Sequence, residues 1–229
     1  MSVFASALRA VYKLSGAKKA FNDGMITCST LSGKAVCRLV WDMNKAENDD
    51  YLEKALSGVP DDFSGRLLEV PVGTGIPTMP LYQTLPQADI TCLDYSPDMM
   101  GQAQEKAARL HLNNVTFRKG DVGALPYADG TFDIVLSLNG FHAFPDKEAA
   151  YREVFQVLRP GGTFCDCFYV RGEHKRTDWI VRHVYEKAGF FTPPYETVSS
   201  LKARLEGMYA DVDMGNLKSM AWFNCRKAK

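Results

Sequence analysis

The sequence predicts an α/β fold with a doubly wound, mostly parallel sheet of seven strands. Five short apolar runs alternate with segments of helical periodicity, which is typical of strand–helix–strand units. Apolar strands that lack polar alternation indicate a parallel sheet covered by helices on both faces. A glycine-containing turn directly after the first run is a third indication, because ligands bind at the carboxyl edge of such sheets.

The core elements follow one another in a regular order. Parallel strands are expected at 66–71, 90–94, 115–119, 132–137 and 163–170. Helices are expected between them near 78–85, 97–111 and 147–157. A last helix over 196–207 precedes two closing strands, 209–215 and 219–226, which should meet at Gly215-Asn216 and add an antiparallel strand to the sheet.

Residues 1–60 are expected to form a helical N-terminal cap, or lid, and residues 61–229 the core. Residues 171–195, rich in charged and aromatic side chains, predict a cap insertion into that core. Helices of the cap and the insertion are expected at 2–14, 34–43, 46–57 and 177–188.

The ends of the first two strands predict a nucleoside site. Gly73 and Gly75 follow the first strand, and glycine lets a backbone approach a ligand closely. Asp94 ends the next strand, where a carboxylate can accept hydrogen bonds from both hydroxyls of a ribose.

The details of this turn favour S-adenosylmethionine over a dinucleotide. The dinucleotide pattern needs a third glycine, and Thr78 stands at that position. Pro77 and Pro80 remove N–H groups from the start of the following helix, which weakens it as a pyrophosphate cradle. Glu69, four residues before Gly73, would repel a phosphate and attract an ammonium group. A nucleoside with a cationic amino-acid tail, such as S-adenosylmethionine, fits these residues.

Four motifs occur in order between about residues 60 and 170. They occupy 69–75, 93–99, 120–127 together with 132–135, and 158–162. Their sequences and spacing resemble class I S-adenosylmethionine-dependent methyltransferases, in the branch similar to the ubiquinone/menaquinone-biosynthesis methyltransferases. One departure is Pro71, which stands where the family usually has the first glycine of its loop. The resemblance implies a Rossmann-like methyltransferase fold, with S-adenosylmethionine as cofactor and S-adenosylhomocysteine as product.

Side-chain chemistry and the resemblance assign roles to the acidic residues. Glu69 is expected to hold the methionine ammonium, directly or through water, or alternatively to cap a nearby helix. Asp94 should bind the ribose hydroxyls. Asp121 with Val122 resembles the pair that reads the adenine edge through a carboxylate and a backbone N–H, unless Asp121 is simply a turn residue.

Two further side chains are expected to flank the adenine ring. These are Tyr95 and Met99, although either could instead pack against the protein. The full expected cofactor-binding set is Glu69, Gly73, Thr74, Gly75, Asp94, Tyr95, Met99, Asp121, Val122 and Asn139.

His142 is the candidate catalytic residue. Methyl transfer from a sulfonium is an in-line displacement, for which positioning and exclusion of water supply most of the acceleration. His142 lies in the stretch 139–144 after the fourth strand, and imidazole titrates near neutrality. It could act as a general base if the acceptor must lose a proton; the alternative is a histidine that packs or hydrogen-bonds beside the cofactor.

Aromatic side chains outside the shared core are expected to build the acceptor pocket. They are Phe21, Trp41, Trp179, His183, Phe190, Phe191 and Tyr195. Such side chains suit an apolar or aromatic small molecule, although each could be ordinary packing. The predicted function is methyl transfer from S-adenosylmethionine to such an acceptor. The alternatives are an S-adenosylmethionine-binding protein without activity and a nucleic-acid or protein methyltransferase.

Net charge and cysteine content limit the kinds of partner and metal site that the sequence predicts. With 27 basic and 27 acidic residues, the chain has no net charge that would favour nucleic acid. Its six cysteines form no C-x-x-C pair, which predicts no metal site and fits a reducing cytoplasm. The basic side of the helix at 2–14 could lie on an anionic bilayer, but packing as a lid or in a homodimer is the favoured alternative, and the oligomeric state is left open.

Overall fold

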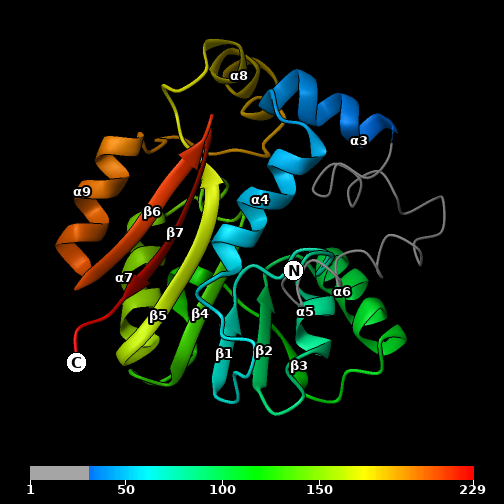
Figure 1. The fold of residues 1–229 in the computed structure, drawn as a ribbon, viewed down its shortest axis with the longest axis vertical. Helices are drawn as coiled ribbons and strands as arrows, with labels where there is room; N and C mark the ends of the chain where they lie inside the picture. Colours follow the sequence, from blue (N-terminus) through cyan, green and yellow to red (C-terminus); the bar gives the residue numbers. More distant parts are fainter. Residues whose placement is uncertain (1–30) are drawn as a thin grey trace.

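The computed structural model describes residues 31–229, so the predicted helix at 2–14 and Phe21 lie outside the described residues. A single seven-stranded sheet has the order β3-β2-β1-β4-β5-β7-β6 (Figure 1). Neighbouring strands from β3 to β5 are parallel, whereas β7 is antiparallel to both β5 and β6. The predicted mostly parallel sheet with an antiparallel closing strand is therefore confirmed.

Most strands begin and end within a few residues of the expected positions. They are β1 Arg66–Glu69, β2 Asp89–Asp94, β3 Val115–Lys119, β4 Phe132–Leu138, β5 Leu158–Tyr169, β6 Asp211–Leu217 and β7 Met220–Arg226. β5 begins earlier than predicted because Leu158 already pairs with Phe132, before the register shifts and Thr163 pairs with Ile134.

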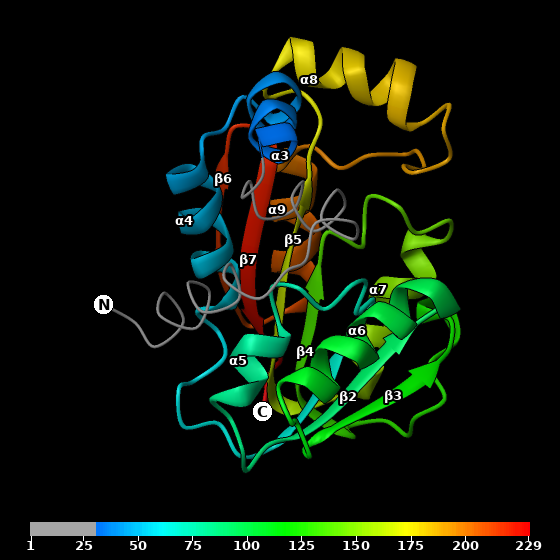
Figure 2. The ribbon, with the colours of Figure 1, turned by 90° about the vertical axis from the view of Figure 1, so that its right-hand side faces the viewer.

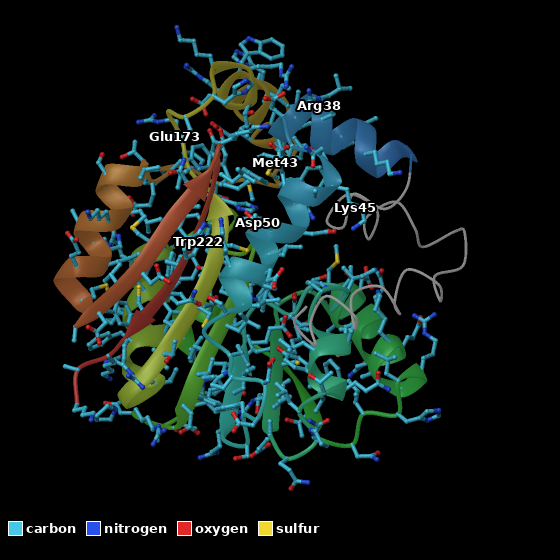
Figure 3. The ribbon with its side chains drawn as sticks, in the orientation of Figure 1. Arg38, Met43, Lys45, Asp50, Glu173 and Trp222 are labelled. Atoms are coloured by element: carbon cyan, nitrogen blue, oxygen red, sulfur yellow. The ribbon has the colours of Figure 1, made fainter. Side chains whose placement is uncertain are left out.

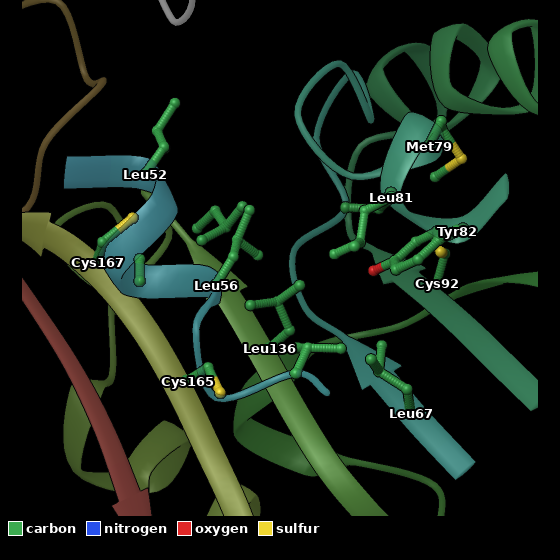
Figure 4. Packing of buried hydrophobic residues seen from close by; sticks show 14 of the residues in the cluster. Leu52, Leu56, Leu67, Met79, Leu81, Tyr82, Cys92, Leu136, Cys165 and Cys167 are labelled. Atoms are coloured by element: carbon green, nitrogen blue, oxygen red, sulfur yellow. The ribbon is translucent and has the colours of Figure 1, made fainter. Parts of the chain in front are cut away.

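Helices cover both faces of the sheet, and each face has its own apolar core. One face is covered by α4 (Lys45–Leu56), α5 (Met79–Gln83) and α6 (Pro97–Arg109), and the other by α7 (Lys147–Val157) and α9 (Val198–Met208) (Figures 1 and 2). Figure 4 shows the first core, in which Leu56 of α4 and Leu81 of α5 pack above Leu67 and Leu136 of the sheet. This arrangement is the predicted doubly wound fold.

Local sequence explains where the helices begin. Asn44 and Glu47 form a capping box at the start of α4, each side chain accepting a hydrogen bond from the other residue's backbone N–H. Ser96 accepts from the Met99 N–H at 3.4 Å, and Pro97 occupies the first turn of α6, as predicted.

Two helical segments form a layer at one end of the molecule. α3 (Leu31–Val36) continues as the π-helical turn η1 (Cys37–Trp41), and α8 (Lys175–Ile180) continues as η3 (Val181–Tyr185). They lie together at the end toward which β5 points (Figures 1 and 2), and Figure 3 shows Arg38 and Glu173 on opposite sides of α8. Thr177 donates to the Val40 carbonyl at 2.6 Å. The helix predicted at 177–188 corresponds to α8 and η3, which begin and end earlier than expected.

The turn between the closing strands differs from its prediction. Gly215-Asn216 was expected there, but both residues lie within β6, and Lys218-Ser219 form the turn. A Cβ added to Gly215 would lie 2.8 Å from the indole of its cross-strand partner Trp222, which Figure 3 labels on β7. Glycine makes room for an aromatic ring at this position, and it does not reverse the chain.

Other global features concern the described residues only. None of the described helices has the length and apolar character needed to span a bilayer. The described residues contain no group of three or more His, Cys, Asp or Glu side chains suited to a metal ion. Cys92, Cys165, Cys167 and Cys225 are buried free thiols, whereas Cys37 is disulfide-bonded, which differs from the reduced thiol expected.

Candidate functional site

Glu69 is the last residue of β1, and its side chain is only 1% exposed. The Tyr82 hydroxyl donates to its Oε2 at 2.8 Å, and the Cys92 thiol lies 3.5 Å from the same oxygen. Figure 4 shows the Tyr82 hydroxyl and the Cys92 sulfur in the same part of the core. Burial raises the pKa of Glu69 to about 8. The acid thus faces α5 and β2 in a dry environment that favours its neutral form.

The loop after β1 has the conformation that its glycines permit. Gly73 and Gly75 have φ angles of +54° and +65°, in the left-handed region that glycine adopts at little cost. A Cβ added to Gly75 would lie 3.0 Å from Met79, so this glycine also allows α5 to pack closely. The buried hydroxyl of Thr74 has no hydrogen-bond partner among the described residues. The loop therefore keeps the Thr74 hydroxyl available, close in sequence to Gly73, where an added Cβ would meet no atom within 4 Å.

Asp94 ties this loop to the end of β2. Its Oδ2 accepts from the Gly73 N–H and its Oδ1 from the Ser96 N–H, both at 2.8 Å. The side chain is buried, and burial raises the pKa of Asp94 even though these N–H groups counteract the shift. The structure thus brings Asp94, the residue predicted to bind the ribose, into direct contact with the predicted glycine loop.

The predicted adenine-binding residues lie around the same edge. The Gly120 N–H donates to the Asp94 carbonyl at 3.1 Å, which places the end of β3 beside the end of β2. Asp121 is exposed and caps the short helix η2 (Val122–Ala124), whose first residue is buried. Tyr95 is 74% exposed, so its ring does not pack in the core.

Asn139 and His142 follow β4 and lie beside the loop of β1. Asn139 has φ +58°, and its Oδ1 accepts from the Tyr51 hydroxyl of α4 at 3.0 Å. Gly140 permits this close approach, because a Cβ there would clash with Pro71. Pro71, the residue that departs from the family pattern, therefore packs against Gly140.

His142 is buried and neutral. Its Nδ1 accepts from the Tyr169 N–H at 3.4 Å, and its ring stacks on Phe191 with centroids 3.8 Å apart. Burial, with a smaller contribution from Lys147, lowers the pKa of His142 to about 3. A histidine with this pKa is a weak base at neutral pH, which favours the packing and hydrogen-bonding alternative.

A pocket of about 170 Å³ opens between the cap and the carboxyl edge of the sheet. Its lining residues are Val36, Trp41, Met43, Asn48, Tyr51, Asn139, His142, Tyr185, Phe191 and Met220. Trp41 and Phe191 are thus brought together as predicted, and their rings stack at 6.1 Å.

The other aromatic residues expected in this pocket lie elsewhere. Tyr195 packs edge-on against Tyr169, and Trp179, His183 and Phe190 are exposed. Phe21 lies outside the described residues.

Sequence reasoning missed Tyr51 and Tyr185. Tyr51 lies on the apolar face of the predicted helix 46–57, and there a pocket-lining tyrosine has the same periodicity as a core residue. Tyr185 lies within the predicted insertion, where its aromatic character was the available signal.

Part of the core is similar to known proteins. Residues 67–162 match the profile of the methyltransferase domain family. The chain is 36% identical over 136 residues to the chloroplastic 2-methyl-6-phytyl-1,4-hydroquinone methyltransferase 2 of Oryza sativa, covering 58% of this chain and 36% of the relative. It is 39% identical over 97 residues to the demethylmenaquinone methyltransferase of Thermus thermophilus, covering 42% of this chain and 44% of the relative.

These matches span less than half the length of the two relatives. Among solved structures, the YcgJ protein of Bacillus subtilis has the same fold, with a TM-score of 0.65 and 18% identity over 79% of this chain and 99% of that one. Residues 67–162 thus match the methyltransferase domain profile, lie on a Rossmann-like sheet and are similar in sequence to demethylmenaquinone and phytylhydroquinone methyltransferases.

Proposed function

We propose that this protein transfers a methyl group from S-adenosylmethionine to a small apolar or aromatic acceptor. The carrying observation is the aromatic pocket, which reaches Asn139 and His142 and so lies next to the loop that follows β1. The similarity to enzymes named as hydroquinone and menaquinone-precursor methyltransferases supports the same acceptor class.

The residues at the edge of the sheet fit the cofactor. The unpartnered Thr74 hydroxyl and the open space beside Gly73 leave room and a polar contact for the methionine part. Each oxygen of the Asp94 carboxylate accepts one backbone hydrogen bond and keeps a second lone pair for a ribose hydroxyl. Glu69 is buried and has no cation beside it among the described residues. The methionine ammonium group would supply a positive charge that stabilises the ionised form of this carboxyl.

The bound cofactor supplies an activated methyl group, so the chain mainly needs to position the acceptor. The aromatic walls exclude water and hold a planar molecule in one orientation. Because the Nδ1 of His142 accepts the Tyr169 N–H, the neutral ring carries its proton on Nε2. We therefore assign His142 a positioning role, as a hydrogen-bond donor to an acceptor oxygen.

The test is release of S-adenosylhomocysteine with a panel of soluble phenols, hydroquinones and naphthoquinols, compared with aliphatic amines. Two neighbouring phenylalanines give a matched pair of variants, since Phe191 lines the pocket and Phe190 is 65% exposed. Phe191→Leu should raise KM for the aromatic acceptor, whereas Phe190→Leu should not. Cofactor binding without turnover across the panel would instead indicate a binding protein without activity, and preference for amines would exclude the proposed acceptor class.

A further inference from the structure

The exposed apolar side chains of this protein gather on the cap. Among the described residues, five large apolar side chains are exposed, and four of them are Leu39, Trp179, Val184 and Phe190, at 62%, 59%, 52% and 65%. The fifth, Tyr95, belongs to the predicted cofactor edge. Single exposed apolar residues are normal on a protein surface, but here three of the four lie between residues 179 and 190, and Leu39 lies on η1 of the same layer.

Exposed basic side chains alternate along the chain with these apolar residues. Lys175 and Arg182 are exposed on α8 and η3, and Lys187 is exposed in the turn that follows; none has an ion-pair partner among the residues that the structure describes. Together these exposed apolar and basic residues make up the cap surface, which consists of Leu39, Lys175, Trp179, Arg182, Val184, Lys187 and Phe190.

Two acids of this segment are turned inward and do not neutralise the cap surface. Asp178 accepts hydrogen bonds from the Tyr169 hydroxyl at 2.7 Å and from the Gly172 N–H at 3.0 Å. Glu186 accepts from the Tyr195 hydroxyl at 3.3 Å. The outward groups of α8 and η3 are therefore mainly cationic and aromatic, although the whole chain has no net charge.

The cap surface belongs to an anchored part of the fold. Arg176 of α8 donates to the Arg38 carbonyl at 3.0 Å and pairs with Asp42 at 3.1 Å. On the inner side of the same segment, Tyr185 packs against Trp41 with centroids 6.0 Å apart. The inner side is thus packed within the fold, and the outer apolar side chains remain exposed among the residues that the structure describes.

We propose that the cap surface docks on an anionic phospholipid bilayer. Tryptophan and phenylalanine favour the boundary between headgroups and acyl chains, and lysine and arginine are attracted by anionic headgroups while their stems remain apolar. Both kinds of side chain are present here on one segment at the outer end of the molecule (Figure 2). A nucleic acid would not need the apolar residues, and an acidic protein would not need so many of them.

Docking in this way would bring the pocket close to the bilayer. Tyr185 and Phe191 line the pocket from the same segment that carries Trp179 and Phe190 outward. A lipophilic acceptor could then pass from the membrane to the pocket over a short path. This consequence rests on the proposed function, whereas docking itself does not.

The experiment is co-sedimentation of the full chain with vesicles of phosphatidylcholine alone or with about 30% phosphatidylglycerol, at low salt and at about 0.5 M salt. Binding is expected only to the anionic vesicles, and high salt should weaken it. Arg182→Glu combined with Lys187→Glu should reduce binding at least about tenfold. The matched control is Arg152→Glu combined with Lys202→Glu, which changes the net charge equally on α7 and α9 and should bind as the parent does.

A second readout tests the aromatic contact. Trp179 emission should shift to shorter wavelength when anionic vesicles are added, and Trp179→Phe should remove that shift while Trp41 and Trp222 remain. Equal binding of the two double variants would overturn the proposal. So would concentration-dependent self-association that is lost in Trp179→Ala without any vesicle binding, because the cap surface would then be a contact between two copies. If the parent protein binds anionic vesicles but transfers no methyl group to any acceptor of the panel, the proposed function is rejected and the docking proposal stands.

Discussion

Glu69 has a pKa that makes the stability of the fold depend on pH. The usual pKa of a glutamate is 4.5, and in the folded protein burial raises it to about 8. The folded state therefore binds more protons than the unfolded state between these values, and the free energy of unfolding falls as pH rises from about 4.5 to 8. The groups that face this carboxyl are Tyr82, Thr78, Cys92 and Asp94, and none of them supplies a positive charge.

Glu69→Gln should remove this pH dependence. The amide imitates the protonated acid and can still accept from the Tyr82 hydroxyl. The variant should therefore gain at least about 1 kcal/mol relative to the parent between pH 6 and pH 9, since one pKa unit corresponds to about 1.4 kcal/mol. Urea unfolding of both proteins at the two pH values measures this difference. A difference that stays constant with pH would show that Glu69 is ionised in the fold.

Asp94→Ala should remove most affinity for S-adenosylhomocysteine. The substitution deletes the predicted ribose contacts, each worth roughly 1.5–3 kcal/mol for a charged acceptor, and also releases the Gly73 and Ser96 N–H groups. Asp89→Ala is the matched control, because Asp89 is an exposed acid at the other end of β2. Calorimetric titration should show at least about a hundredfold weaker binding for Asp94→Ala alone. Equal affinities of the two variants would remove Asp94 from the cofactor site.

At the level of helices and strands, the core was predictable because its signals are local. Buried parallel strands such as Leu67–Glu69 and Ile134–Leu138 are short apolar runs, and each ends where the pattern changes. The turn between β6 and β7 was not predictable in this way. Gly215 makes room for the indole of Trp222 on the neighbouring strand, and Lys218, a residue other than glycine, adopts the positive φ of +54° in the turn. The pocket residues Tyr51 and Tyr185 depend on how the cap packs, which no local pattern specifies.

The cap segment α3–η1 should respond to the cofactor. Trp41 of η1 lines the pocket, and the part of the expected N-terminal cap up to about Trp41 is the part expected to order over the cofactor, which residues 16–41 test. Amide exchange in this range should slow when S-adenosylhomocysteine binds, because the ligand supplies contacts that stabilise the segment. Helix α9, which packs on the other face of the sheet, is the internal control and should not change. Unchanged protection of residues 16–41 would contradict the lid interpretation.

Across the whole molecule, segments far apart in the sequence meet at the carboxyl edge of the sheet. The cap helices before the core and the insertion after β5 join through the contacts of Thr177 with Val40 and of Arg176 with Asp42. These contacts join the segment 31–42 to the insertion 171–195, whereas α4 packs on a face of the sheet. A pocket made at such a junction can change its walls without changing the sheet, so specificity for the acceptor is expected to lie in the cap.

The complete protein should discriminate between nucleotide ligands. α5 is short, begins after Thr78 and contains Pro80, so it offers few N–H groups to a pyrophosphate. S-adenosylhomocysteine at about 100 times its Kd should stabilise the fold by about 2.7 kcal/mol, whereas NAD at the same concentration should not. Thermal unfolding of the parent and of Asp94→Ala checks both points, because the variant should lose the shift. Protection by NAD without protection by S-adenosylhomocysteine would show that this edge binds a dinucleotide.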